Sequence, residues 1–361
     1  MNIYIPLAIF FILLAFFTKS KEKPSNVVFT IMMLVSMGFA AVRFEFGPDY
    51  FQYRDMYERL DELGVEGYLQ TNEHIEALFL YFLHSFPSYE LFIAVQSILW
   101  FGCVYLFLRN RMDTRYLWLV IFLLYFDVNN ILNNYVAIRT SFVGILFLIA
   151  LPYLKTKKII YILLLSLAFF IHNSSAPLLL LALFKGDKII YTKIDMRSIA
   201  IIIGAVSFFF GDIIAGPITD YIINLFPDAL GKYSYYMDNM FFNRSISLGN
   251  FVFLVIKVFI VLMLLKGLRL EKEYEYVLFY KIAILIFMLS ILFGNMIFGR
   301  INMNIAPLLI VIYIRTLKYL KKDMAFCFVA GLMVVSLFAF YNVINSEYSV
   351  TFLEYHSILS K

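Results

Sequence analysis

Charge is scarce in this sequence. Charged residues occupy only 15% of the 361 positions, whereas 62% are hydrophobic, and the mean hydropathy is +0.83. A water-soluble domain of this length does not need so much apolar surface. The sequence therefore predicts an integral membrane protein that occupies residues 1–361 as a single domain.

Cysteine and histidine are also scarce, and the motifs of several enzyme classes are missing. The two cysteines, Cys103 and Cys327, lie inside apolar runs, which favours a role as small buried hydrophobic residues. The sequence has no Asp-x-Asp, no His-Glu-x-x-His and no cluster of His or Cys, so no metal ion is expected. It also lacks Gly-x-Ser-x-Gly, a Walker loop and a glycine-rich dinucleotide turn, which argues against serine hydrolysis and nucleotide use. No cofactor and no nucleic-acid partner are predicted.

What the sequence does contain is a series of apolar runs without the alternation of a barrel strand, which predicts an all-α fold. Their lengths indicate about 12 transmembrane helices in a polytopic membrane protein. The first run, Met1 to Phe17, has no basic segment before it and is expected to be a retained helix. The predicted helices are 3–18, 27–42, 88–108, 116–132, 136–154, 159–172, 174–185, 198–215, 250–266, 276–294, 299–316 and 324–341.

Two segments between these helices are too long to be simple turns. Residues 43–87 and 216–249 are predicted to be long extracytoplasmic loops within the membrane domain. The apolar stretch Ile75–Phe86 in the first loop is too short to span a bilayer, so it is expected to be a re-entrant or interfacial helix. Aromatic residues in the second loop are typical of an interfacial belt, and stacking on sugar rings is the alternative.

The basic residues differ in number and type between the two sets of gaps. Twenty of the thirty basic residues lie in every second gap between the predicted helices, starting with the gap that contains Lys19. The positive-inside rule makes these gaps cytoplasmic. Six of those twenty are arginine, whereas six of the eight on the opposite side are arginine. Arginine binds phosphate or carboxylate in a bidentate way, which lysine cannot do. The pattern therefore indicates an anion-binding site on the outer face.

Four ionisable residues lie at the predicted outer ends of helices. Arg43 ends the second helix, Arg139 opens the fifth, His172 ends the sixth and Arg300 opens the eleventh. Each has an ordinary explanation taken alone, as a snorkelling anchor, a helix cap or a turn residue. Their shared depth favours a common site, because ionisable groups at this depth usually face the protein interior or an aqueous cavity.

Three carboxylates of the first outer loop could join this site. The turn at Gly47-Pro48 can bring Asp49 back toward Arg43. Glu73 and Glu76 are three residues apart and share a face if that stretch is helical. The alternative for all three is a solvated acid or a structural ion pair.

Five short stretches carry a resemblance to a known family. They are Arg43-x-x-x-Gly47-x-Asp49-Tyr50-x-x-Tyr53, Glu73-x-x-Glu76, Asn134-x-x-x-Ile138-Arg139, Phe170-Ile171-His172-x-Ser174-Ser175 and Gly299-Arg300-Ile301. In order and spacing, over about residues 30–315, the chain resembles the EpsG-type membrane proteins, which are grouped with the Wzy polymerases of bacterial polysaccharide assembly. It departs from the family pattern at Thr140, where Gln is frequent, and at Asn302 and Asn304, where a Tyr is frequent.

The resemblance implies a glycosyltransferase that polymerises oligosaccharide repeat units carried on polyprenyl diphosphate. Because the metal-binding motifs are missing, the enzyme is expected to be metal-independent. The expected place is the outer face of a bacterial cytoplasmic membrane, in the biosynthesis of capsule, exopolysaccharide or O-antigen. Implied partners are the lipid-linked oligosaccharide, membrane lipid, and the flippase and chain-length regulator of the same pathway. The leaving diphosphate needs positive charge placed in advance, and the acceptor hydroxyl needs a base.

The site residues expected from this chemistry fall into three groups. Diphosphate contacts are expected from Arg43, Arg139 and Arg300. The base is expected among Asp49, Glu73, Glu76 and His172, with Glu73 or Glu76 favoured because Arg43 would lower the pKa of Asp49. Further substrate contacts are expected from Tyr50, Tyr53, Asn134 and Arg244.

Two other functions fit some of the residues. A transporter or flippase of the same lipid-linked sugar would also need arginines in a cavity, but it should place ionisable groups near the midplane, where only Lys257 lies. A membrane acyltransferase could use His172 as a base, but it leaves the arginines without a role.

Overall fold

The structure, a computed structural model, describes residues 4–18, 22–47, 49–71, 77–172, 175–183, 197–206, 248–293, 295–345 and 356–358. Nearly all of this part of the chain is helical, and the described residues contain one sheet of two very short strands. The chain divides into two compact units. Unit 1 comprises Met1–Leu183, Met303–Ile314 and Ser336–Lys361, and unit 2 comprises Phe184–Asn302 and Arg315–Val335.

Unit 1 contains most of the helices. In chain order its elements are α1 (Tyr4–Phe17), α2 (Glu22–Ala41), β1 (Arg43–Phe44), α3 (Asp49–Thr71), α4 (Ala77–His84), α5 (Tyr89–Arg109), the 3-10 turn η2 (Thr114–Tyr116), α6 (Leu117–Phe126), α7 (Ile131–Val136), α8 (Ile138–Ala150), α9 (Tyr153–Thr156), α10 (Lys158–Ile171), α11 (Ala176–Leu180), the 3-10 turn η4 (Leu181–Leu183) and β2 (His356–Ser357). Parts of α17 (Asn295–Leu317) and α18 (Lys322–Ile344) also belong to it.

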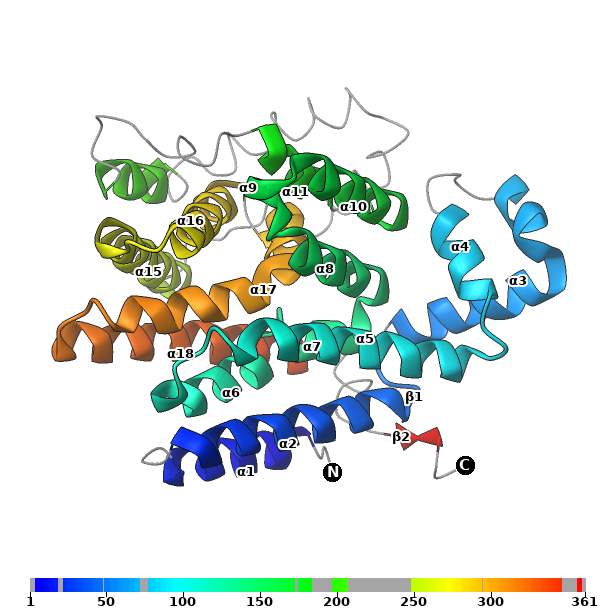
Figure 1. Cartoon of the computed structure of the whole chain (residues 1–361), viewed down its shortest axis with the longest axis horizontal. Coiled ribbons are helices and arrows are strands. Elements are labelled where there is room, and N and C mark those ends of the chain that lie inside the picture. The colour runs from blue at the N-terminus through cyan, green and yellow to red at the C-terminus, as the bar shows by residue number, and fades with distance from the viewer. Residues whose placement is uncertain are drawn as a thin grey trace. The chain divides into compact units, whose positions relative to one another are not determined.

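The helices of unit 1 pack on one another in a series of pairs. Helix α2 lies along one side of α5, α8 lies along another, and α10 packs on α8, while α1 packs on α6 (Figure 1). Helix α5 begins at Tyr89 because the side chain of Ser88 accepts a hydrogen bond of 3.2 Å from the Leu91 N–H and caps the first turn. Acidic Glu90 in the first turn and basic Arg109 in the last complement the helix dipole.

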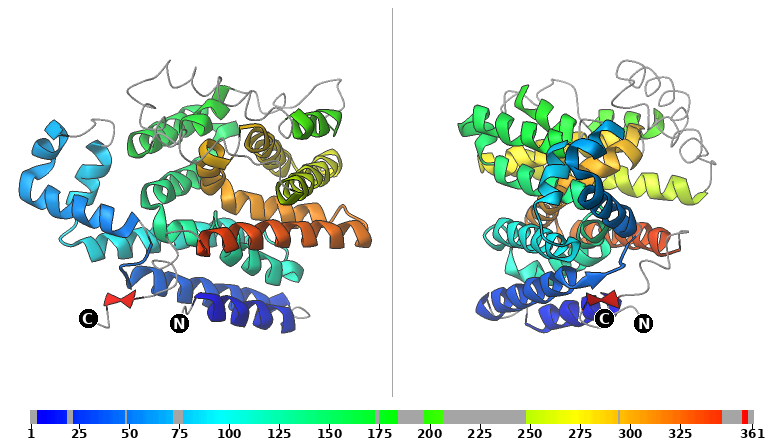
Figure 2. Two further views of the ribbon diagram at one scale, coloured as in Figure 1. Left: turned by 180° about the vertical axis from the view of Figure 1, so that it is seen from behind. Right: turned by 90° about the vertical axis from the view of Figure 1, so that its right-hand side faces the viewer.

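Helices α3 and α4 form a hairpin in the first predicted outer loop, visible in Figure 1 and from behind in Figure 2. Helix α3 bends at Gly64, whose φ of 68° is outside the helical range. The Tyr57 hydroxyl of α3 donates a hydrogen bond of 2.7 Å to the carbonyl of Phe86, which follows α4, and so links the two helices. Phe79 of α4 packs edge-on against Phe92 of α5, with 6.1 Å between ring centroids. Helix α4 has eight residues and cannot span a bilayer, but whether it enters the membrane stays a prediction.

The stretch 116–154 differs from its prediction as two long helices. Helix α6 ends at Phe126 because the Asp127 carboxylate accepts a hydrogen bond of 3.0 Å from the Asn129 N–H, which turns the chain out of the helix. Helix α7 then precedes a break at Ala137, where ψ is 71°, and α8 follows. After α8 the chain turns at 151–152 and continues as the four-residue α9. The predicted helix 174–185 is likewise only the short α11 followed by η4.

Unit 2 contains a helix over Arg197–Val206, α15 (Leu248–Leu270), α16 (Tyr274–Phe293) and the remaining parts of α17 and α18. Helices α15 and α16 pack closely, because Gly267 leaves room for the Tyr280 ring, which a Cβ at that position would overlap. The Tyr280 hydroxyl and the Thr316 hydroxyl are 2.9 Å apart and satisfy each other. Lys257 lies within α15 with its ammonium 4.7 Å from the Phe253 ring centroid.

Several helices expose large apolar side chains. Phe17 and Ile159 of unit 1 are 77% and 74% exposed, and Phe326 of unit 2 is 75% exposed. Such faces suit contact with lipid rather than water. Among the described residues, four helices are long and apolar enough to cross a membrane, and seven further apolar helices have 10 to 17 residues. The all-α, multi-pass membrane fold is confirmed, while the number of 12 spans stays a prediction.

Candidate functional site

The first part of the candidate site is the turn between α2 and α3. Arg43 lies in β1, just beyond the end of α2, and pairs with Ser357 of β2, while the Ile358 N–H donates a hydrogen bond of 3.0 Å to the Val42 carbonyl. The turn needs glycine at Gly47, because its φ is +88° and a Cβ would lie 2.9 Å from a methyl carbon of Val136. This close approach places the turn before α3 against Val136 at the end of α7.

Arg43 is buried, with 2% of its surface exposed. Its Nη1 donates hydrogen bonds of 2.7 Å to the Ala40 carbonyl and of 2.7 Å to the Ser97 hydroxyl, and its Nη2 donates one of 3.1 Å to Gln96 Oε1. These uncharged acceptors fix the guanidinium plane between α2 and α5. A buried polar group costs free energy unless it is hydrogen-bonded, so Arg43 depends on these partners.

The partners of Arg43 are themselves held in place. Gln96 Nε2 donates a hydrogen bond of 2.6 Å to the Ser141 hydroxyl, which donates one of 2.7 Å to the Ile138 carbonyl. The Ser97 hydroxyl donates one of 2.8 Å to the Ile93 carbonyl. Gln96 and Ser97 are fully buried. The result is a hydrogen-bonded chain that runs from Arg43 through α5 to the start of α8.

Arg139 lies in the first turn of α8 and is half-buried. Its Nε donates a hydrogen bond of 3.0 Å to the Tyr53 hydroxyl, and its guanidinium carbon is 5.6 Å from the Tyr53 ring centroid and 5.9 Å from that of Phe79. Arg43 lies 5.5 Å from the ring centroid of Tyr135, four residues before Arg139. The segments 43–53 and 135–139, which carry Arg43 and Arg139 at the ends of two predicted helices, therefore meet in unit 1.

Asp49 and Tyr50 occupy the first turn of α3. Asp49 is half-buried, and Tyr50 is 2% exposed and packs edge-on against Tyr89, with 5.2 Å between ring centroids. Burial raises the pKa of Tyr50 to about 12, so its hydroxyl stays protonated at neutral pH and does not act as a base. The predicted pairing of Asp49 with Arg43 stays a prediction.

His172 lies at the C-terminal end of α10 and is 8% exposed. Its backbone N–H donates a hydrogen bond of 2.9 Å to the Ala168 carbonyl, and its backbone carbonyl accepts one of 3.2 Å from the Ser175 N–H. Helices α8 and α10 are joined by a short connection and pack on each other, so the chain reverses direction between them. The C-terminal end of α10, at His172, therefore lies on the same side as the N-terminal end of α8, at Arg139.

Several predicted site residues lie outside the described part of the chain. Glu73, Glu76 and Arg244 are not described, and for Asn134 in α7 and Arg300 in α17 only the backbone is. Arg300 is in the second turn of α17, not at its start, because the helix begins at Asn295. Their roles stay predictions. Among the described residues, no group of three or more His, Cys, Asp or Glu could hold a metal ion, and metal independence also stays a prediction.

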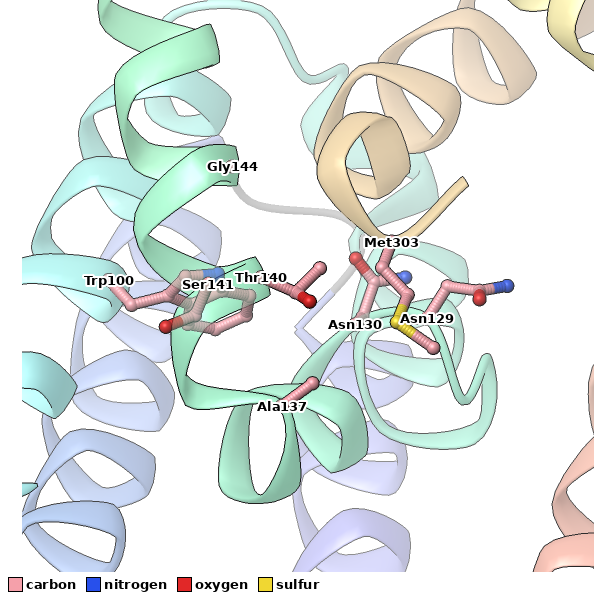
Figure 3. Close-up of a pocket in the computed structure, with 8 residues that line it drawn as sticks. All are labelled: Trp100, Asn129, Asn130, Ala137, Thr140, Ser141, Gly144 and Met303. Carbon is pink, nitrogen blue, oxygen red and sulfur yellow. The ribbon is translucent and has the colours of Figure 1, made fainter. Parts of the chain in front are cut away.

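Unit 1 also contains a small pocket beside this network, drawn in Figure 3. It has room for about one water molecule. Ser141 belongs both to its wall and to the chain of hydrogen bonds from Arg43. The pocket is lined by Trp100, Asn129, Asn130, Ala137, Thr140, Ser141, Gly144 and Met303.

The sequence analysis missed the residues that hold Arg43. Gln96 and Ser97 are adjacent polar residues inside an apolar span, and a polar pair at that depth is costly enough to indicate a partner. The pairing of β1 with residues 356–358 had no comparable signal, because two-residue strands carry no pattern.

Helical spans and a cluster of arginine and polar side chains at helix ends define a multi-pass membrane protein with an internal polar site. The sequence model of the EpsG family matches residues 26–357, nearly the whole chain, and the protein belongs to this family. The EpsG family is a Wzy-like polysaccharide polymerase family. No curated protein and no solved structure matches the chain.

Proposed function

We propose that this protein joins oligosaccharide repeat units carried on polyprenyl diphosphate at the outer face of a bacterial cytoplasmic membrane. In the reaction, an acceptor hydroxyl oxygen forms a bond to the anomeric carbon of the donor sugar. The bond from that carbon to the diphosphate breaks, and the polyprenyl diphosphate leaves with the electron pair. The hydroxyl proton passes to a base on the protein.

The observation that carries this proposal is the meeting of segments 43–53 and 135–139 around Arg139. A guanidinium placed before the reaction stabilises the charge that develops on a leaving diphosphate. Arg139 suits this role because Tyr53 and Phe79 hold it while it remains half-buried. Arg300 is proposed as a further diphosphate ligand on the sequence pattern alone.

Arg43 is proposed to act next to the diphosphate in a supporting way. Its burial and its bonds to Ala40, Gln96 and Ser97 suit a fixed positive charge that orients the site more than a group that grips the ligand. Among the candidate bases, Glu73 or Glu76 is proposed first, and Asp49 and His172 are the other candidates. Tyr53 is proposed to contact substrate beside Arg139.

The cellular setting follows from the proposed substrate. The lipid-linked repeat unit is assembled elsewhere and must reach the outer leaflet, so a flippase and a chain-length regulator of the same pathway are proposed partners. The product would be capsule, exopolysaccharide or O-antigen polysaccharide. Labelling of single cysteines placed at residues 60 and 157 tests the orientation, with reaction expected from outside at 60 and from inside at 157.

Reconstitution tests the reaction itself. The purified chain in lipid vesicles is expected to convert lipid-linked repeat units, extracted from cells that lack this protein, into a ladder of longer chains. The ladder is expected to form equally in EDTA, and its loss there would show a metal requirement. Transfer of repeat units across the bilayer without chain growth would instead favour a transporter.

A further inference from the structure

The pocket in unit 1 has a lining that differs from the rest of the candidate site. Figure 3 shows Trp100 and Ser141 on one side, Asn129, Asn130 and Met303 on the other, and Thr140 between them. None of the lining side chains is charged. A wall of one indole and several hydroxyl and amide groups suits an uncharged polar ligand and does not suit a phosphate or a carboxylate.

Asn130 shows which kind of group is missing from the pocket. Its side chain is 1% exposed, and its Nδ2 donates a hydrogen bond of 3.2 Å to the Leu123 carbonyl. A carbonyl can only accept, so the amide orientation is fixed and Oδ1 is the free acceptor. Oδ1 is buried and has no hydrogen-bond partner among the described residues. A buried acceptor without a partner is costly, so the pocket calls for a donor at this position.

Two neighbours strengthen this requirement. The side chain of Thr140 is directed toward Asn130 in Figure 3 and offers a hydroxyl that can donate or accept. Asn304 follows the lining residue Met303 on α17, is 1% exposed, and has neither amide atom hydrogen-bonded within the described chain. The backbone of Asn304 lies against Gly144, which lines the pocket.

The pocket is also linked to the arginine network. Ser141 in its wall accepts a hydrogen bond from Gln96, and Gln96 accepts one from Arg43. An occupant of the pocket therefore lies close to the groups that the proposed function places around the diphosphate. The sugar attached to that diphosphate is an uncharged polar molecule with many hydroxyl donors.

We propose that this pocket is a sugar-recognition subsite that takes one hydroxyl-sized, uncharged hydrogen-bond donor of the lipid-linked repeat unit, with Asn130 Oδ1 as its acceptor. The small size admits a single substituent and excludes a whole ring. The inference rests on the proposed function for the identity of the substrate. It assigns Asn130 and Thr140 to selection of the sugar and not to the chemical step.

Filling the pocket gives the sharpest test. A Cβ at Gly144 would lie 3.6 Å from the Asn304 carbonyl oxygen, an ordinary contact, so Gly144→Ala is expected to fold while its methyl group narrows the pocket. Gly102→Ala is the matched control, because its Cβ would meet nothing within 4 Å on α5. Gly144→Ala is expected to raise the KM for the extracted repeat unit about tenfold, as a misplaced methyl group does in a selective pocket. Gly102→Ala is expected to leave KM unchanged.

Removing the Thr140 hydroxyl distinguishes the effect of a lost hydrogen bond from the effect of a smaller pocket. Thr140→Val keeps the shape and is expected to raise KM about threefold to tenfold through the lost hydrogen bond, with little change in kcat. Thr140→Ser keeps the hydroxyl and is expected to recover most of that loss. If the pocket holds only a structural water, Thr140→Val and Gly144→Ala will lower the thermal stability and leave KM as in the wild type, and the proposal is then wrong.

A direct measurement of binding distinguishes failure of the proposed subsite from failure of the proposed polymerase reaction. The affinity of the detergent-solubilised protein for the same extracted repeat unit is expected to fall in Gly144→Ala and Thr140→Val by the factors given for KM. If the wild type binds the repeat unit and the variants bind it more weakly, but no chain grows, the subsite stands and the polymerase proposal fails. If all variants bind and polymerise like the wild type, the subsite fails and the polymerase proposal stands. If the wild type does not bind the repeat unit, both fail.

Discussion

Two arginines in this protein differ in the acceptors of their described hydrogen bonds. Arg315 in unit 2 donates hydrogen bonds of 2.7 Å and 3.2 Å to the two carboxylate oxygens of Glu271, donates another to Glu273, and lies 4.0 Å from the Tyr276 ring centroid. Arg43 in unit 1 donates its described hydrogen bonds to a carbonyl, an amide and a hydroxyl. The first arrangement is a bidentate ion pair, and the second is a set of neutral acceptors.

The difference distinguishes a structural ion pair from a functional site. We call Arg315 with Glu271 and Glu273 the brace, because this ion pair links helices of unit 2. A carboxylate both orients a guanidinium and cancels its charge, so Arg315 with Glu271 and Glu273 joins the end of α17 to the α15–α16 connection. A neutral acceptor orients a guanidinium without itself adding negative charge. The hydroxyl of Tyr53 is such an acceptor for Arg139. A bidentate ion pair suits stability, and orientation by neutral acceptors suits a group whose charge acts on a substrate.

The electrostatics of Glu271 agree with a permanent brace. Burial of its carboxyl opposes ionisation, but hydrogen bonds from Arg315, from the Glu273 N–H and from Tyr319 outweigh burial and lower its pKa to about 2. Glu271 is therefore ionised throughout the neutral range, and the pair with Arg315 persists there.

The largest effect is expected at Arg139, whose charge is proposed to act on the substrate. Arg139→Ala is expected to reduce polymer formation by about 100-fold or more, because one preorganised charge-stabilising group is lost. Arg139→Lys is expected to restore only part of the activity, since lysine lacks the bidentate fork. Polymer length and accumulated repeat units are measured by gel. Full activity in Arg139→Ala would remove this arginine from the reaction.

Substitution in the brace is expected to lower stability and to leave the polymerase activity unchanged. Glu271→Gln leaves Arg315 with a weaker partner and is expected to lower the free energy of unfolding by on the order of 2 to 3 kcal/mol. The protein that remains folded should polymerise at the wild-type rate. Glu58→Gln is the matched control, because its pair with Arg54 is exposed and contributes at most about 0.5 kcal/mol. Thermal unfolding in detergent measures both. Equal stability of the two variants would mean that Arg315 and Glu271 do not brace the fold.

A smaller effect is expected at Gln96, where substitution tests whether a neutral acceptor is needed to orient Arg43. Gln96→Met removes an acceptor of Arg43 and the donor to Ser141 at similar side-chain length. We expect kcat to fall about tenfold because Arg43 loses its fixed orientation, with KM nearly unchanged. Gln52→Met, at an exposed position on α3, is the control. A change in KM alone would show that Gln96 serves binding and not the orientation of Arg43.

The sequence was sufficient for the class of fold and for the helix ends that carry Arg139 and His172. Apolar runs locate membrane helices because lipid imposes one strong requirement on every span. The break at Asp127 was missed because it depends on a local side-chain hydrogen bond that competes with the helix. The break at Ala137 has no side-chain cap, and its non-helical ψ of 71° left no mark in the apolar pattern.

The arrangement of the candidate site could be predicted only in part. The resemblance grouped Arg43, Tyr53 and Arg139, but nothing in the sequence fixed which of them would be buried. Burial of Arg43 depends on the packing of α2 against α5, and the partners Gln96 and Ser141 are far apart in the chain. Residues that meet only through tertiary packing leave no periodic signal.

The smallest effect concerns pH and tests whether the brace is ionic. The pKa of Glu271 is lowered in the folded protein, so its contribution to stability is fully present above the unfolded pKa of about 4.3 and is lost as the pH falls toward 2. The stability difference between wild type and Glu271→Gln should therefore be constant from pH 8 to 5 and shrink by less than about 1 kcal/mol at pH 4. Thermal unfolding at each pH measures this difference. A difference that already changes between pH 8 and 6 would mean that another group, and not the Glu271 carboxylate, supplies the pH dependence of the brace.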